Sequence, residues 1–117
     1  ARPLMEENRS HIFFREAPVA DRADGPVAAA KVPLTAERSL AVDRLLHTFG
    51  TPVFVSADTV NGAYWSKLMI AQDTGSAIQG PVRGDLFFGF GNDAGIGAGL
   101  MRENGTYYLL LPRKDSP

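Results

Sequence analysis

The feature that most constrains this chain is an apolar run that leads directly into an acidic turn. Residues 68–71 read Leu-Met-Ile-Ala, which is typical of a strand covered on both faces. Asp73 follows, in a turn made by Thr74, Gly75 and Ser76. A carboxyl group at the edge of a core is poorly solvated, which favours its neutral form and suits it to proton donation. Asp-Thr-Gly is also an ordinary turn sequence, and the local sequence alone favours that simpler interpretation.

Size and composition indicate one soluble-type domain over residues 1–117. The 12 basic and 13 acidic residues give a formal net charge of -1, so no attraction of the whole chain to nucleic acid is expected. The chain has no cysteine, which excludes disulfides, thiolate metal sites and cysteine nucleophiles. With only His11 and His47 as histidines, neither a metal site nor a cofactor is predicted.

Turn signals punctuate the chain at short intervals, which is typical of a small, mostly β barrel or sandwich. Asn61-Gly62 is the strongest of these signals and predicts a hairpin. The pattern of apolar residues between the turns predicts six or seven short strands. They cover residues 11–15, 30–34, 39–43, 53–56, 64–72, 85–90 and 106–111.

One or two short helices accompany the strands. The first is expected within residues 1–10, and the second over residues 92–102 with Asn92 as its N-cap. Residues 1–29 form a lead-in segment that includes a loop over residues 17–28, which is rich in proline, aspartate and glycine.

A glycine motif precedes the second helix. Residues 89–94 match G-x-G-x-x-A, but the βαβ unit and the following acid of a dinucleotide site are both missing. A tight strand-to-helix turn is therefore the preferred interpretation. Phe87 and Phe88 alternate across one predicted strand and Tyr107 and Tyr108 across another, so one of each pair is expected in the core. The outward members, with Tyr64 and Trp65, are candidates for a sugar-stacking wall, although core packing is the more frequent use of such residues.

Aspartates at strand ends are the stronger lead to a function. Asp43 ends one predicted strand, Asp73 ends the central one, and Asp85 opens the next. Strand ends of a small barrel can converge on one rim, where two neighbouring carboxyl groups separate into an acid and an ionised partner. A turn or capping function is favoured for Asp43, and both interpretations stay open for Asp85.

Four stretches together resemble a known family, the 3D domain, which is named for three aspartates. They are Ala-Val-Asp at 41–43, Phe-Gly-Thr-Pro-Val-Phe-Val at 49–55, Ala-Gln-Asp-Thr-Gly-Ser-Ala-Ile-Gln-Gly at 71–80 and Gly-Asp-Leu-Phe-Phe-Gly at 84–89. The flanking residues 8–15, 32–35 and 94–99 are similar to the membrane-bound lytic murein transglycosylase A family. The resemblance covers nearly the whole chain.

This resemblance implies a six-stranded double-psi β-barrel and a peptidoglycan substrate. The implied reaction is a non-hydrolytic, lyase-type cleavage of the β-1,4 bond between N-acetylmuramic acid and N-acetylglucosamine, which leaves a 1,6-anhydro ring. Asp73 takes the position of the catalytic acid and Asp85 that of its tuning partner. Substrate-binding contacts are expected from Asp43 and residues 74–76. The resemblance also implies a periplasmic, outer-membrane-associated enzyme of cell wall degradation.

Two departures qualify the resemblance. The family often has a lysine where this chain has Gln79, and family members are longer, with a substrate groove between the barrel and a second domain. We therefore expect this chain to be the C-terminal part of a longer enzyme whose remaining segment is its partner. The alternatives are a non-catalytic peptidoglycan-binding module and a purely structural barrel.

Overall fold

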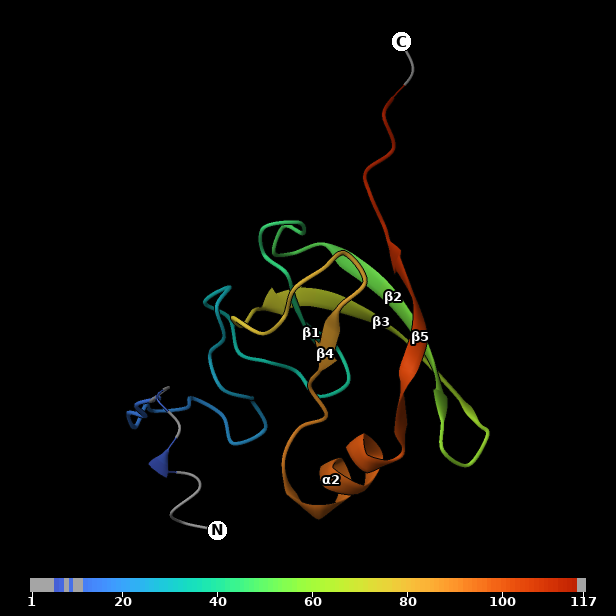
Figure 1. Cartoon of the computed structure of the whole chain (residues 1–117). Helices are drawn as coiled ribbons and strands as arrows, with labels where there is room; N and C mark the ends of the chain where they lie inside the picture. The colour runs from blue at the N-terminus through green and yellow to red at the C-terminus, as the bar shows by residue number, and fades with distance from the viewer. Residues whose placement is uncertain (1–5, 8, 10–11, 116–117) are drawn as a thin grey trace.

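The computed structural model describes residues 6–7, 9 and 12–115 and contains one mixed β-sheet with a short helix beside it (Figure 1). The five described strands are ordered β4-β1-β3-β2-β5 across the sheet. Their bounds are β1 Ser39–Val42, β2 Pro52–Thr59, β3 Tyr64–Asp73, β4 Gly84–Leu86 and β5 Met101–Leu109, and the helix α2 is Gly91–Gly99. The prediction of a mostly β chain is confirmed.

The sheet is mixed because one pair of neighbouring strands is parallel and the other pairs are antiparallel. β1 pairs with β3 in parallel, whereas β4 pairs antiparallel with β1 and β2 pairs antiparallel with both β3 and β5. The predicted hairpin at Asn61-Gly62 is confirmed as the β2–β3 connection, and Gly62 has the positive φ of 81° that the turn needs.

The sheet curls so that its two edge strands approach one another. A Cβ atom placed on Gly84 of β4 would lie 3.1 Å from a ring carbon of Tyr107 on β5. Both strands line an inner hollow of about 120 Å³, together with Leu40 and Val55 from the strands between them. The described strands therefore form a half-barrel, with five strands where six were expected.

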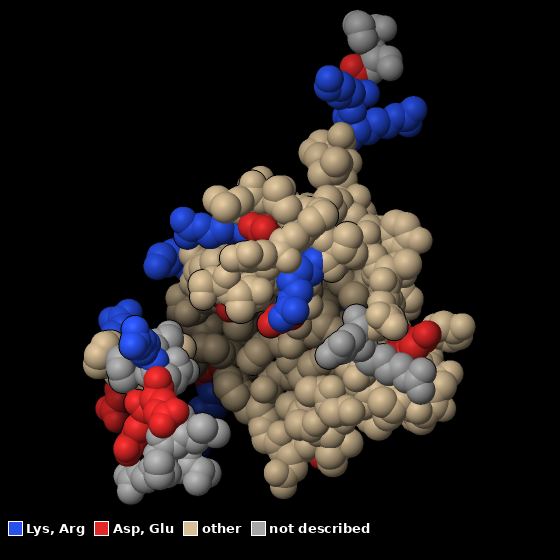
Figure 2. All heavy atoms as spheres, viewed as in Figure 1, with Lys and Arg blue, Asp and Glu red and all other residues tan. Residues whose placement is uncertain are grey.

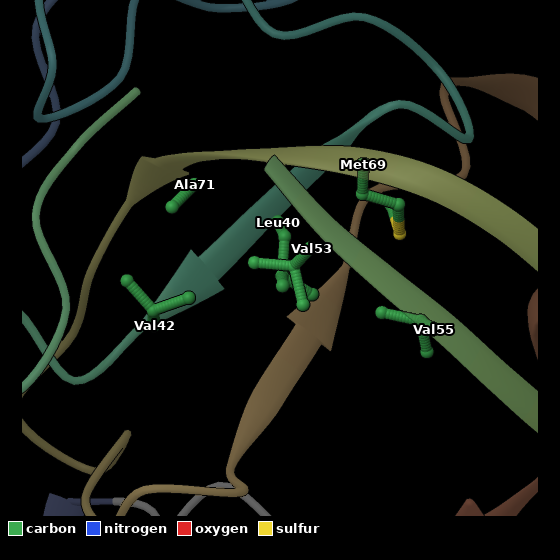
Figure 3. Close-up of a cluster of buried hydrophobic side chains, with 6 residues drawn as sticks. All are labelled: Leu40, Val42, Val53, Val55, Met69 and Ala71. Atoms are coloured by element: carbon green, nitrogen blue, oxygen red, sulfur yellow. The ribbon is translucent and has the colours of Figure 1, made fainter. Parts of the chain in front are cut away.

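The core fills the concave side of this half-barrel. Six buried side chains make it, and Figure 3 shows them converging from β1, β2 and β3: Leu40, Val42, Val53, Val55, Met69 and Ala71. In β3 the alternation leaves Leu68 42% exposed while Met69 is fully buried. The expectation that residues 68–71 are covered on both faces is therefore wrong; β1 is the strand buried on both faces, since all four of its residues are buried.

Two predicted strands near the N-terminus are also wrong. Residues 12–15 belong to no strand, and Phe13 and Phe14 are exposed. Residues 30–34 contain no ladder, only an isolated bridge between Val27 and Pro33. Proline lacks an N–H and cannot continue a ladder, which explains the short pairing. The helix expected within residues 1–10 falls mostly outside the described residues.

The C-terminal elements occur where expected, with shifted boundaries. β4 ends at Leu86 instead of residue 90. The N–H of the next residue, Phe87, still donates to the backbone oxygen of Ser39 on β1, and it makes the last such bond of this segment. The helix begins at Gly91 after an extended Phe90, so Asn92 is not the N-cap. β5 begins at Met101, earlier than the predicted residue 106. No helix among the described residues is long and apolar enough to cross a membrane.

Gly105 should be intolerant of any side chain, because it lies on β5 directly opposite Ala57. A Cβ at this position would be 2.6 Å from the backbone oxygen of Ser56, which cannot move without breaking the ladder. We expect Gly105→Ala to destabilise the protein by about 1–3 kcal/mol in urea unfolding. Gly95→Ala on α2 is the matched control, since its Cβ would meet nothing within 4 Å. Equal stability of the two variants would contradict this packing.

Candidate functional site

The C-terminal end of β1 brings the three predicted aspartates into one region. Ala41 lies opposite Asp73 on the parallel strand β3 and opposite Asp85 on the antiparallel strand β4. Asp43 follows two residues later on the same chain segment. Since neighbouring strands lie about 4.8 Å apart, the Cα atoms of Asp73 and Asp85 are separated by two strand spacings, about 10 Å. The two side chains therefore flank β1 and do not form a directly bonded pair.

A bulge at Gln72 sets the position of Asp73. Leu40 pairs with Ala71 but Ala41 pairs with Asp73, so Gln72 has no partner on β1. Such an extra residue bends a strand and turns the following side chain in a new direction.

Gln72 is fixed by hydrogen bonds to both its side chain and its backbone. The buried hydroxyl of Ser39 donates to its Oε1 at 2.6 Å, and its backbone oxygen accepts from the Ala30 N–H at 3.0 Å. Ser39 Oγ itself accepts from the Thr35 N–H at 2.7 Å. These contacts fix the bulge, and with it the end of β3.

Asp73 and Asp85 line the same open hollow, which we call the Asp73 hollow. Its volume is about 200 Å³, and its wall includes apolar side chains from two other segments, Leu34 and Ile78, and Phe87 from the segment that carries Asp85. Phe87 stacks edge-on against Phe90, with ring centroids 5.7 Å apart. Two carboxylates, an apolar wall and an aromatic ring are suited to a polar ligand with apolar faces, such as a sugar.

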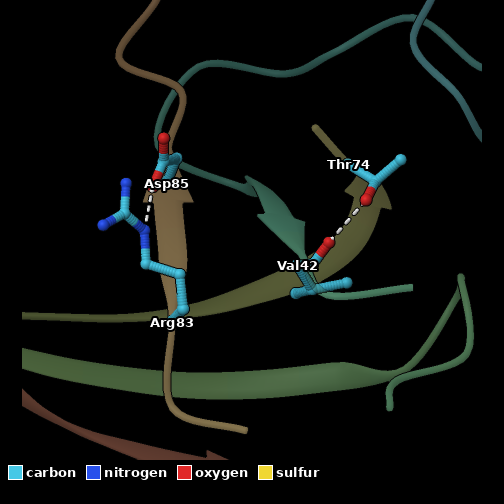
Figure 4. A network of polar contacts seen from close by, with 4 residues as sticks. All are labelled: Val42, Thr74, Arg83 and Asp85. Carbon is cyan, nitrogen blue, oxygen red and sulfur yellow. Dashed lines mark hydrogen bonds and ion pairs between the residues drawn. The ribbon is translucent and has the colours of Figure 1, made fainter. Parts of the chain in front are cut away.

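The three carboxylates have different partners. Asp73 is half-buried, and its Oδ1 accepts the backbone N–H of Ala29 at 3.2 Å. Asp85 is about half exposed and pairs with Arg83, whose Nε lies 3.0 Å from Oδ1 (Figure 4). An ion pair this exposed contributes little to stability, so the Arg83 group mainly orients Asp85.

Asp43 fixes the chain where it leaves β1. Its Oδ2 accepts the N–H of Gly80 at 2.9 Å, and its Oδ1 accepts the N–H of Leu45 at 3.0 Å. The Gly80 bond, then the Leu45 bond, and to a smaller extent nearby His47 lower the pKa of Asp43 below its usual 3.8. His47 is itself buried and bonds to Pro81 O through Nε2 at 2.8 Å. Asp43 therefore joins the β1 exit to residues 80–81.

Residues 74–76 make backbone and side-chain contacts within the turn. Thr74 Oγ1 donates to Val42 O at 2.8 Å, which connects the ends of β3 and β1 (Figure 4). Gly75 O accepts from the Ile78 N–H, and Ser76 O accepts from Gln79 Nε2, both at 3.0 Å. Together with Asp43 these residues line a second hollow of about 330 Å³. Ile78 borders both hollows, so the two are adjacent.

The aromatic residues do not gather into a single wall on which a sugar could stack. Tyr64 is 83% exposed, but it begins β3 whereas Asp73 ends it, a distance of roughly 30 Å at about 3.3 Å per residue. Trp65 packs against the core and Phe88 instead. Phe87 is the aromatic side chain that lines the Asp73 hollow.

Charged side chains of both signs line the two hollows: Asp43, Arg44, Asp73 and Asp85. Figure 2 shows charged side chains scattered over the viewed face, with most of the sheet body uncharged. No group of acidic and histidine side chains that could hold a metal ion occurs among the described residues.

Three residues that position the site were not predicted from the sequence: Ala29, Ser39 and Gln72. Ala29 and Asp73 are 44 positions apart, and an alanine carries no chemical signal of its own. Ser39 and Gln72 act through a bulge, which local periodicity does not reveal. The sequence offers Phe87 only as one of the pair Phe87 and Phe88, either of which could face a ligand, and Phe87 is the one that lines the Asp73 hollow.

The architecture and the aspartates define a class of domain. The model of the 3D-domain family matches residues 38–111, which contain Asp43, Asp73 and Asp85, and the chain belongs to this family. More particularly, it is the 3D domain of the membrane-bound lytic murein transglycosylase A (MltA) family.

Relatives of known type share most of this chain. Membrane-bound lytic murein transglycosylase A of Vibrio cholerae is 34% identical over 116 residues, which cover 93% of this chain and 30% of that protein. A solved membrane-bound lytic murein transglycosylase from Agrobacterium tumefaciens is 53% identical with a TM-score of 0.74, over 93% of this chain and 30% of that one. MltA of Escherichia coli, solved with bound chitohexaose, is 32% identical with a TM-score of 0.78, over 92% and 33%. The chain thus spans about a third of the relatives that it matches.

Asp43 should make stability depend on pH. Its lowered pKa means that the folded state binds the proton less readily than the unfolded state. The resulting stabilisation is present above the ordinary pKa of 3.8 and is lost as pH falls through the lower, folded-state value. We expect Asp43→Asn to lower Tm at pH 7, with a difference from wild type that shrinks below pH 3.8. A difference that is constant between pH 7 and pH 3 in calorimetry would contradict the assignment.

Proposed function

We propose that this chain carries the acid–base group of a lytic transglycosylase that cleaves the β-1,4 bond between N-acetylmuramic acid and N-acetylglucosamine in peptidoglycan. The observation that supports this best is the placement of Asp73. Its carboxyl group stands at the bulged end of β3, is half-buried, and borders a hollow with an apolar and aromatic wall. A half-buried carboxyl group beside an open hollow is suited to donating a proton to a bound sugar.

One carboxyl group can serve both proton transfers. Asp73 donates its proton to the glycosidic oxygen as the bond from that oxygen to C1 of the muramic acid breaks. The 6-hydroxyl of the same sugar then attacks C1, and the Asp73 carboxylate accepts the proton of this hydroxyl. The products are a free 4-hydroxyl and a 1,6-anhydro ring, and Asp73 ends the cycle protonated. Ordinary glycosidases use a second carboxylate for the nucleophile or its activation, and here the substrate supplies the nucleophile.

The other predicted site residues have supporting functions in this proposal. Asp85 borders the same hollow from the opposite side of β1 and positions the sugar or tunes Asp73 through space. Asp43 and residues 74–76 line the adjacent hollow and provide the next contacts along a glycan strand. A strand that occupies both hollows would pass over Ile78, which borders each of them.

We further propose that the half-barrel is completed as a double-psi barrel by a segment outside this chain, and that a second domain forms the opposite groove wall. The relatives are about three times as long as the matched region, which leaves ample chain for both. Two polar groups on side chains packed against the core also support a missing segment. Tyr107 Oη and Trp65 Nε1 are buried without a hydrogen-bond partner among the described residues, and burial raises the pKa of Tyr107 to about 12.

The glycan partner and the location are proposed from the relatives. MltA of Escherichia coli was solved with chitohexaose, a chain of linked sugars, and the relatives are named membrane-bound enzymes of murein. A periplasmic enzyme associated with the outer membrane fits this description and the peptidoglycan substrate.

Asp73→Asn in the full-length protein should abolish the release of anhydro-muropeptides from purified peptidoglycan. Loss of a general acid–base group costs at least about 100-fold in rate, and mass spectrometry of the soluble products measures it. Circular dichroism and Tm should stay near those of wild type, because asparagine can still accept the Ala29 N–H. Normal turnover by this variant would refute Asp73 as the acid.

Two further measurements test the function of Asp85 and the alternative of a non-catalytic binding module. We expect Asp85→Asn to retain measurable activity, reduced by about 10-fold, because a positioning carboxylate transfers no proton. Wild-type protein that binds peptidoglycan in a pull-down assay but yields no anhydro product would favour the non-catalytic binding module.

A further inference from the structure

We propose that a hairpin over residues 25–34 positions Asp73 and determines which of its two carboxyl oxygens carries the proton. This inference rests on the proposed function, because it assigns a task to the hairpin within the same reaction. The observation behind it is that the tip of the hairpin donates backbone N–H groups to the end of β3.

The hairpin is held together by its own backbone. Gly25 N–H donates to Leu34 O at 2.9 Å and Leu34 N–H donates to Pro26 O at 3.0 Å. Gly25 is buried, and a Cβ there would overlap Leu34 O, so the two arms are in close contact. Leu34, at the end of the second arm, is buried and lines the Asp73 hollow. The base of the hairpin is thus part of the wall of the site.

The tip is a tight turn with a left-handed residue. Lys31 N–H donates to Ala28 O at 2.9 Å, and Ala28 N–H donates to Val32 O at 3.0 Å. Lys31 has a φ of 65°, a conformation that this type of turn ordinarily gives to glycine. In such a turn the two central residues, Ala29 and Ala30, do not use their N–H groups within the hairpin.

Both free N–H groups reach the end of β3. Ala30 N–H donates to the backbone oxygen of Gln72, the bulged residue, at 3.0 Å. Ala29 N–H donates to Oδ1 of Asp73 at 3.2 Å. The first contact docks the tip on β3, and the second acts on the carboxyl group itself.

The contact from Ala29 makes the two oxygens of Asp73 unequal. An N–H donor stabilises negative charge on Oδ1, and a proton on Oδ1 would face the hydrogen of Ala29. The proton therefore resides on Oδ2, which becomes the oxygen that exchanges protons with the substrate. The same N–H stabilises the carboxylate that remains after proton donation, so it should act mainly on kcat.

The test replaces single amides by esters in the full-length protein. Incorporating lactic acid in place of Ala29 removes the N–H on Asp73 and keeps the methyl side chain. The same replacement at Ala23 is the matched control, since its N–H donates to the exposed carboxylate of Asp21 at 2.9 Å, outside the hairpin and the site. With a soluble glycan strand as substrate, we expect the Ala29 ester to lower kcat about 10- to 100-fold with KM within about twofold, the range for one hydrogen bond to an ionised group. The Ala23 ester should change kcat by less than about threefold.

A second measurement does not depend on activity. In the full-length protein labelled with ¹⁵N-alanine, the Ala29 amide signal should move in Asp73→Asn, because the carboxylate oxygen that accepts its N–H becomes an amide oxygen. The Ala23 signal, from an amide bonded to Asp21, should not move. This readout decides the contact even where the ester variant does not fold.

The outcomes separate this inference from the proposed function. Wild-type protein that forms no anhydro product would refute the proposed function, and the Ala29 amide signal would still test the contact. If the wild type is active, three results would each overturn the positioning of Asp73 by the hairpin. The Ala29 ester could have the kcat of the wild type, or both esters could lose activity equally. The third such result is an Ala29 signal that is unchanged by Asp73→Asn.

Discussion

The parallel pairing of β1 with β3, interrupted by a single unpaired residue, is the constraint on which the rest of the site depends. It places the buried strand β1 between Asp73 and Asp85 and aligns both with Ala41. The register jump at Gln72 shifts Asp73 by one position relative to a regular ladder, and the buried Ser39 hydroxyl holds Gln72 in this arrangement. Because a buried polar pair is costly to break, the bulge is as firmly specified as the core around it.

Three aspartates of one family motif have three different electrostatic environments. Asp43 accepts two backbone N–H groups, which lower its pKa and make it an anchor for the turn. Asp85 is oriented by an exposed guanidinium group and adjoins solvent. Asp73 accepts one N–H on one oxygen and borders an apolar hollow with the other side of the carboxyl group available. Of the three, Asp73 combines partial burial with an oxygen that has no hydrogen-bond partner among the described residues, which suits an acid that must also act as a base.

The sequence predicted the parts of this fold that local chemistry determines. The hairpin at Asn61-Gly62, the strand at β1 and the aspartates at strand ends follow from turn propensity and apolar runs. The apolar residues Phe13 and Phe14 were misread as part of a strand, because β propensity cannot show whether a pairing partner exists. The bulge and the Ala29 contact depend on pairing between segments far apart in the chain, and a backbone N–H has no signature in the sequence.

The most direct test of Asp73 as the acid is a crystal structure of the full-length Asp73→Asn variant with a bound peptidoglycan glycan strand. The asparagine amide reproduces the protonated acid, since its oxygen can accept the Ala29 N–H while its NH₂ group donates. We predict that this NH₂ group lies within hydrogen-bond distance, about 2.6–3.2 Å, of a glycosidic oxygen that follows N-acetylmuramic acid. A glycan bound away from the Asp73 hollow, or one whose glycosidic oxygens are all beyond reach of this side chain, would contradict the assignment.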